Sequence, residues 1–204
     1  MGMSDVRAVF KTAGVVADPN GISTVAAVAN NAALVIGGAL ASGGAVALNA
    51  GQLVTILSSA DDSAISFTIV GTDIQGDALT ESLTGATAAA TVTSVAFFKT
   101  IASITAVGDP AGNVTAGVSS SCADVIFAGR ARLKGTYIVN SGTAGTIKFR
   151  TTSQAGDTQM EVGTVASATV TRDIHVPEEG VLFTAGVYIT YTGGTFASMT
   201  AFHA

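Results

Sequence analysis

The chain has 204 residues, and only 11% of them are charged, against about 25% in ordinary globular proteins. Its formal net charge of −5 argues against a nucleic-acid-binding protein, because contact with phosphates needs a basic surface. The 24 glycines, the 6% aromatic content and the lack of tryptophan favour thin, strand-rich domains over a helical enzyme. The length allows one large or two small domains with a real core.

Residues 1–31 are expected to form an extended N-terminal arm. Val6–Lys11 (VRAVFK) has the composition of a short strand, and the sequence DPNG at 18–21 predicts a tight turn. No charged residue follows this turn until Asp61. Such a charge-poor segment suggests burial against a neighbouring subunit, so residues 1–50 are expected to contact partners.

Ile22–Leu48 is apolar enough to raise the question of a membrane helix, which needs about 20 predominantly apolar residues. Polar residues and two Gly-Gly pairs interrupt this segment, and neither end carries a basic flank. We therefore expect no membrane span. Ala32–Leu48 is expected to form two short strands separated by glycine-rich turns.

Val54–Gly117 has the clearest strand pattern, with short apolar/Thr-Ser alternations between turn residues. Ile65, Phe67 and Ile69 are expected on one face of a strand. A longer strand is expected at Thr91–Lys99, with both of its faces covered. Residues 32–118 are therefore predicted to form an antiparallel β-sandwich domain.

The character of the sequence changes at the serine run 119–121, and we expect a domain boundary near 118–123. Residues 122–204 are predicted to form a second β-sandwich or barrel from about seven short strands. These strands are expected at Leu133–Val139, Gly145–Thr151, Thr158–Val162, Ala168–Val176, Gly180–Phe183, Val187–Thr192 and Ser198–Phe202. The predicted fold class is all-β, with two antiparallel β-sandwich or jelly-roll-like modules after the extended arm.

The sequence offers no catalytic, cofactor-binding or metal-binding candidates. Cys122 is the single cysteine, so neither an intrachain disulfide nor a cysteine-based zinc site can form, and it is expected to be an inert, partly buried thiol. His175 and His203 lie in no metal-ligand spacing and are expected to be structural or exposed. The motifs of metalloproteases, α/β-hydrolases and phosphate-binding loops do not occur.

The carboxylates group at Asp61-Asp62, at Asp73, Asp77 and Glu81, and at Glu178-Glu179. Glycoside hydrolysis would need a cleft and usually aromatic platforms, and a calcium loop would need denser ligand spacing. Surface turns in which Asp caps its own backbone amides are the better interpretation. The basic stretch Arg130–Lys134 would place three charges on one face of a strand, where we expect solvent or a partner.

Two stretches resemble small structural proteins of tailed bacteriophages, and together they cover about half of the chain. The first is Val54–Gly117, with its DDS, GTD and AGNVT turns. The second is Ile174–Phe202, which resembles virion proteins with a G-x-x-F-x-x-G-x-Y-V strand pair. Gly180, Phe183, Gly186 and Tyr188 carry this second pattern.

The resemblance implies a capsid decoration or cement protein, often trimeric, that binds the major capsid protein. It would be made in the host cytoplasm, reside on the capsid exterior and need no cofactor, nucleic acid or membrane. One alternative is a tail, tail-tip or neck component, and another is a host-surface or glycan-binding adhesin module. An enzyme is the least expected class.

Overall fold

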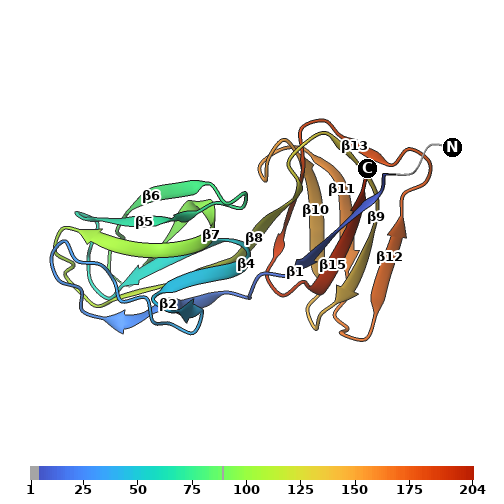
Figure 1. The fold of residues 1–204 in the computed structure, drawn as a ribbon. Helices are drawn as coiled ribbons and strands as arrows, with labels where there is room; N and C mark the ends of the chain where they lie inside the picture. Colours follow the sequence, from blue (N-terminus) through green and yellow to red (C-terminus); the bar gives the residue numbers. More distant parts are fainter. Residues whose placement is uncertain (1–4, 89) are drawn as a thin grey trace. The chain divides into compact units, whose positions relative to one another are not determined.

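The structure is a computed structural model that describes residues 5–88 and 90–204. Within these residues it is all-β, as predicted, with antiparallel strands and no helix (Figure 1). The chain divides into two compact units. Unit 1 comprises Met1–Gly14 and Ser121–Ala204, and unit 2 comprises Val15–Ser120.

Unit 1 is built from two layers. The first sheet has the order β1-β15-β9-β12, with β13 also paired to β9, and the second layer has the order β11-β10-β14-β8. Their bounds are β1 (Arg7–Thr12), β8 (Val114–Phe127), β9 (Ala131–Asn140), β10 (Gly145–Thr151), β11 (Thr158–Thr164), β12 (Thr171–His175), β13 (Val181–Phe183), β14 (Val187–Thr192) and β15 (Phe196–His203).

Alternation along these strands places apolar side chains between the two layers of unit 1. Ile138 and Met199 from the first sheet and Phe149 and Ile189 from the second are all 0% exposed. Aromatic rings also connect the layers. Tyr191 on β14 lies 4.8 Å from Phe196 on β15, measured between ring centroids.

Unit 2 has the strand order β8-β4-β7-β5-β6, with β2 added to β8 and β3 to β4. Its bounds are β2 (Asp18–Ala26), β3 (Ala41–Ser42), β4 (Ala45–Ser58), β5 (Ser66–Thr72), β6 (Ala78–Thr84) and β7 (Thr91–Val107). The first part of β7 pairs with β4 and its last part with β5. One long strand thus serves both pairings around an apolar core that includes Phe67, Phe98 and Ile104.

Residues 5–31 do not form a separate arm, because β1 and β2 within them belong to the sheets of the two units. Residues 1–4 lie outside the described part of the chain, β1 pairs with β15 in unit 1, and β2 pairs with β8 in unit 2. Pairing of this kind satisfies backbone N–H and C=O groups that an isolated arm would leave to solvent. The predicted turn at 18–21 instead begins β2, in an irregular register.

The chain passes between the units twice, at Gly14–Val15 and at Ser120–Ser121. The first passage was not predicted, and the second lies within the region predicted for the boundary. The strand β8 runs through this point without a break, because serine is polar but does not interrupt an extended backbone. The long predicted strand at 91–99 extends to Val107, and Val95 is 86% exposed, so its outer face is not covered there. Among the described residues, we found no helix with the length and apolarity needed to cross a membrane.

Candidate interaction surface

Cys122 lies in the interior of unit 1 and is 1% exposed. Burial, and secondly the charge of Asp124, raise the pKa of its thiol to about 12. Tyr191 on β14 lies opposite Cys122 on β8, and burial likewise raises the pKa of the Tyr191 phenol. The Tyr191 hydroxyl accepts a hydrogen bond from the Gly14 amide at 3.0 Å. A buried thiol that stays protonated is a poor nucleophile.

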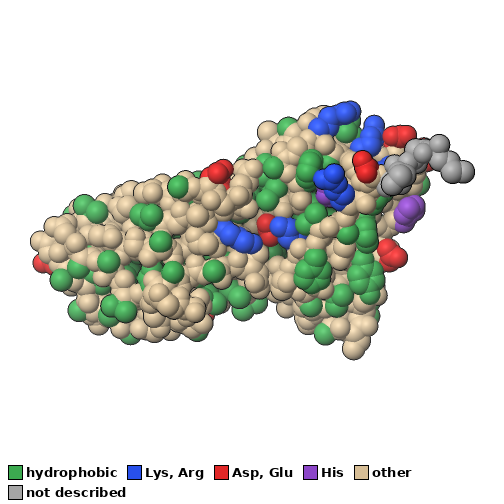
Figure 2. Space-filling model, viewed as in Figure 1, with side chains coloured by type: hydrophobic (Ala, Val, Ile, Leu, Met, Phe, Trp, Pro, Cys, Tyr) green, Lys and Arg blue, Asp and Glu red, His purple; other side chains and the backbone are tan. Residues whose placement is uncertain are grey.

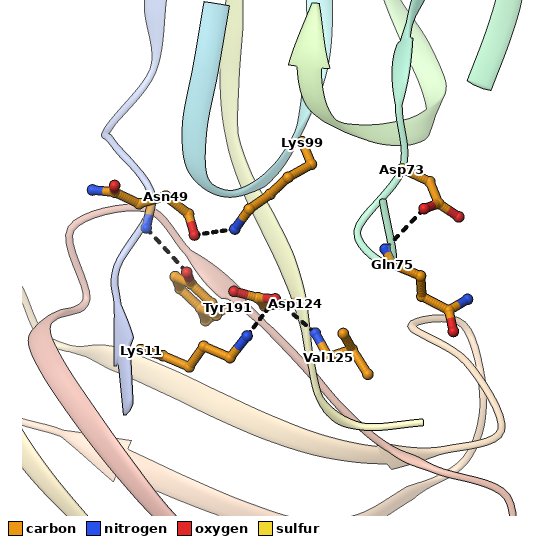
Figure 3. Close-up of polar contacts among 9 residues, drawn as sticks. Lys11, Asn49, Asp73, Gln75, Lys99, Asp124, Val125 and Tyr191 are labelled. Atoms are coloured by element: carbon orange, nitrogen blue, oxygen red, sulfur yellow. Dashed lines mark hydrogen bonds and ion pairs between the residues drawn. The ribbon is translucent and has the colours of Figure 1, made fainter. Parts of the chain in front are cut away.

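Lys11 and Asp124 form an ion pair that joins the two layers of unit 1 (Figure 3). The Lys11 ammonium lies 2.9 Å from Asp124 Oδ1, and the same oxygen accepts the Val125 amide at 2.8 Å. The side chains are 19% and 3% exposed, respectively. Because Lys11 points inward from the edge strand β1, its ion pair with Asp124 connects β1 to β8 in the other layer.

Several carboxylates of unit 2 cap backbone amides. Asp73 accepts the amide of Gln75 at 2.8 Å (Figure 3). It also accepts the amide of Asp77 at 3.0 Å and thereby closes the β5–β6 turn. Asp61 accepts the Ser63 hydroxyl and amide, which lower the pKa of Asp61. The turn-capping predicted for these aspartates is therefore confirmed.

Other predicted carboxylates also bind backbone rather than each other. Glu81 on β6 accepts the amides of Val95 and Ala96 at 2.7 and 3.0 Å. Asp62, only 2% exposed, accepts the Ala111 amide at 2.7 Å. Within residues 5–88 and 90–204, no three His, Cys, Asp or Glu side chains come together as a metal site would require.

Only two of the three basic residues in the stretch 130–134 lie on a strand, because β9 begins at Ala131. Arg132 lies 3.6 Å from Glu179, and Lys134 donates to the carbonyl oxygens of Glu178 and Glu179. These contacts hold the turn between β12 and β13 against β9. Arg130 precedes the strand and lies in the turn after β8.

The first sheet of unit 1 turns a second face outward, away from the core, which we call the outer face. Its central row runs Phe10–Thr200–Tyr137–Asp173 across four neighbouring strands. The rows on either side are Ala8–Phe202–Gly135–His175 and Thr12–Ser198–Val139–Thr171. Figure 2 shows hydrophobic side chains gathered over this part of the sheet.

Three aromatic side chains lie around Thr200 on the outer face. Phe10 is 66% and Tyr137 is 41% exposed, and Phe202, at a diagonal position to both, is partly buried. Diagonal neighbours on a sheet lie about 7–8 Å apart, within reach of aromatic side chains. Gly135 places no side chain beside Phe202, and a Cβ at this position would lie 2.5 Å from the Ile174 carbonyl oxygen, too close for a larger residue.

The outer face reaches an open edge of the sheet. β1 pairs with β15 on one side and ends the sheet on the other. An edge strand offers backbone groups to a partner, although an inward charge such as Lys11 discourages indiscriminate pairing. Exposed aromatic residues beside polar ones are typical of protein–protein contacts, where aromatic residues carry much of the binding energy.

The sequence placed Phe10 and Tyr137 in predicted strands. Phe10 falls within residues 1–50, which were expected to contact partners, but neither side chain was singled out and Tyr137 lay outside that range. The alternation of side chains along a strand is enough to place Phe10 on the face opposite to that of Val9 and Lys11. It could not indicate which of the two faces would be buried, because that depends on the pairing of β1 with β15. Neither protein-family models, nor curated proteins, nor solved structures matched this chain when compared with it.

Proposed function

We propose that the chain is a structural protein of a tailed-phage virion that binds the assembled capsid and stabilises it. The observation that carries this proposal is the outer face of unit 1, with its exposed aromatic cluster beside an open sheet edge. The resemblance of Val54–Gly117 and Ile174–Phe202 to phage structural proteins supports the virion assignment. The side chains described above serve as turn caps, ion pairs and core, which is the organisation of a structural protein.

The proposed mechanism is thermodynamic. A protein that binds only the assembled lattice favours assembly by mass action. A homotrimer would engage three lattice subunits at once, so that weak individual contacts add through multivalency. The outer face would be buried against the major capsid protein, with Phe10 and Tyr137 as the residues that contribute most to affinity.

The test is co-sedimentation of the purified full-length chain with capsids that lack it. The double variant Phe10→Ala/Tyr137→Ala is expected to bind about 10–100-fold more weakly, as loss of two aromatic contacts implies. Val95→Ala is the matched control, since Val95 is the most exposed of the large apolar residues and lies on unit 2. It is expected to bind like the wild type.

Equal binding by the double variant and the wild type would refute the outer face as the capsid contact. No binding by the wild type would refute the capsid role, and stacked rings in negative stain or retention on a glycan array would favour the tail or adhesin alternative. Deleting residues 1–30 is a poor substitute because it removes β1 and β2 from their sheets. Mass measurement in solution tests the trimer.

A further inference from the structure

A small hollow lies at one end of unit 1, where distant parts of the chain converge. It has a volume of about 190 Å³ and is lined by Asp5, Arg7, Phe127, Arg130, His203 and Ala204. These residues come from the start of β1, the end of β8, the turn after it and the end of β15. The hollow is separate from the outer face, because Arg7 and His203 alternate with the outward residues Ala8 and Phe202.

Two of the side chains at the hollow are guanidinium groups that lack a partner elsewhere in the described residues. Six of the nine basic side chains have a hydrogen-bond or ion-pair partner. These are Lys11, Lys99, Arg132, Lys134, Lys148 and Arg150. Within residues 5–88 and 90–204, Arg7, Arg130 and Arg172 make no such contact, and the first two line the hollow.

The inner wall of the hollow is an aromatic stack. The His203 ring lies 4.9 Å from the Phe127 ring at an interplanar angle of 27°, and His203 is only 4% exposed. Burial, and secondly the charge of Arg7, lower the pKa of His203. The neutral imidazole keeps one ring N–H as a donor, and in the described residues no hydrogen bond occupies that side chain.

We propose that this hollow binds a single oxyanion group, a phosphate or a carboxylate, between Arg7 and Arg130. A guanidinium presents paired N–H donors that match the two oxygens of such a group, and these charge-assisted hydrogen bonds are the strong ones. His203 adds a donor from the wall, and the volume admits one such group rather than a nucleotide. The inference stands whether or not the proposed function is correct.

Asp5 at the same hollow opposes the anion. With His203 neutral, the side chains of Arg7, Arg130 and Asp5 sum to a formal charge of +1, before any α-carboxylate at Ala204 is counted. Binding of a free anion is therefore expected to be weak, in the millimolar range. Asp5 also provides a variant with the opposite effect on anion affinity. Asp5→Asn removes the repulsion of the anion and is expected to tighten binding several-fold.

The experiment follows the His203 ring signal of the full-length, ¹³C-histidine-labelled protein by NMR at low ionic strength and pH 7.5. Sodium sulfate and inorganic phosphate are titrated, and the His203 signal is assigned by its loss in His203→Asn. A saturable shift is expected. Arg7→Ala/Arg130→Ala should weaken binding at least 10-fold. Arg172 is also exposed and also makes no hydrogen bond or ion pair with the described residues, so Arg172→Ala should bind like the wild type.

A further arm distinguishes the sources of the oxyanion. A glutamate-containing tripeptide with blocked ends that competes with sulfate would identify a protein carboxylate as the natural group, and phosphate binding without peptide binding would identify a small inorganic anion. A shift that never saturates, or one lost equally in Arg172→Ala, would overturn the proposal. Arg7 and Arg130 are exposed, and unchanged thermal unfolding of the double variant verifies that it is folded.

Discussion

The two units of this protein differ most in how they use charge. Unit 2 holds one Lys and seven Asp or Glu residues, which gives a formal charge of −6. Unit 1 holds eight of the nine basic residues and seven acidic ones, which gives +1, so that the two units together account for the net −5. The low overall charge of the chain therefore conceals an uneven distribution.

In unit 2 the carboxylates Asp62, Asp73 and Glu81 accept backbone amides, and a buried neutral amide makes further contacts with the backbone. Gln52 is 0% exposed, exchanges two hydrogen bonds with the backbone of Val15 and donates a third to the Ser119 carbonyl oxygen. In unit 1 charged side chains join strands, as in the Lys11–Asp124 pair. In unit 2, therefore, the polar side chains mainly bind the backbone, whereas unit 1 pairs opposite charges across its layers and carries both of the surfaces that we propose for recognition.

The largest expected effect comes from the cores. Phe98→Ala in unit 2 and Phe149→Ala in unit 1 each truncate a ring that is 0% exposed, and each is expected to lower the free energy of unfolding by about 3–5 kcal/mol. Hydrogen exchange should show lost protection mainly within the mutated unit. Equal loss across both units in either variant would show that they unfold together.

The next effect concerns the ion pair of unit 1. Lys11→Met removes the ammonium that lies 2.9 Å from the nearly buried Asp124, and is expected to cost about 2–3 kcal/mol in urea unfolding. Lys148→Met is the matched control. Lys148 and Glu161 lie 4.0 Å apart at 44% and 54% exposure, so its loss should cost less than about 0.5 kcal/mol. Equal costs would contradict the structural role of the Lys11 pair.

Gln52→Leu tests how much the buried Gln52 amide contributes to the stability of unit 2. The variant leaves the amide and carbonyl of Val15 without their Gln52 partners, and a destabilisation of about 2 kcal/mol is expected in urea unfolding. Gln75→Leu alters an exposed glutamine in a turn and should stay within about 0.5 kcal/mol of the wild type. A neutral outcome for Gln52→Leu would mean that apolar packing alone holds Val15 to β4.

The smallest effect is a change in pH dependence. The lowered pKa of His203 means that the folded state favours the neutral ring, so this stabilisation is complete above the ordinary pKa of 6.5. It is lost as the pH falls from 6.5 through the lower folded-state pKa. Arg7→Ala should raise the His203 pKa toward 6.5 without reaching it, because burial is the larger cause.

An NMR titration of the His203 ring signal measures this shift directly. The fall in stability between pH 7.5 and 5 should also be smaller in Arg7→Ala than in the wild type. The control must not change a charge at the hollow, which rules out Asp5 and Arg130 because both line it. Arg172 is not a lining residue, so Arg172→Ala is the appropriate control. An unchanged His203 pKa in Arg7→Ala would show that Arg7 does not act on the imidazole.

Much of the strand pattern could be predicted from local sequence. The bounds of β10 and β14 are those predicted, because β-branched alternation between turn residues marks both ends. β4 was not predicted as one strand, since the residues LNAG at 48–51 lack a strand signal and are held by an irregular register against β7. β8 was divided at its serines for the same reason, although its backbone continues through them.

The candidate sites, by contrast, depended on contacts between distant residues. Phe10 and Tyr137 share a face only because β15 lies between β1 and β9. Arg7, Arg130 and His203 line one hollow because the end of β15 returns to the start of β1. No spacing in the sequence records these approaches.

By itself, therefore, the sequence determined the all-β class, most of the strands, the turn-capping role of the aspartates and one of the two places at which the chain changes unit. Only the tertiary structure decided which strands pair, which face of each is buried and where residues 5–31 belong. The physical reason is that alternation and turn chemistry are properties of neighbouring residues. Strand pairing is instead selected by the burial and hydrogen bonding of the whole unit.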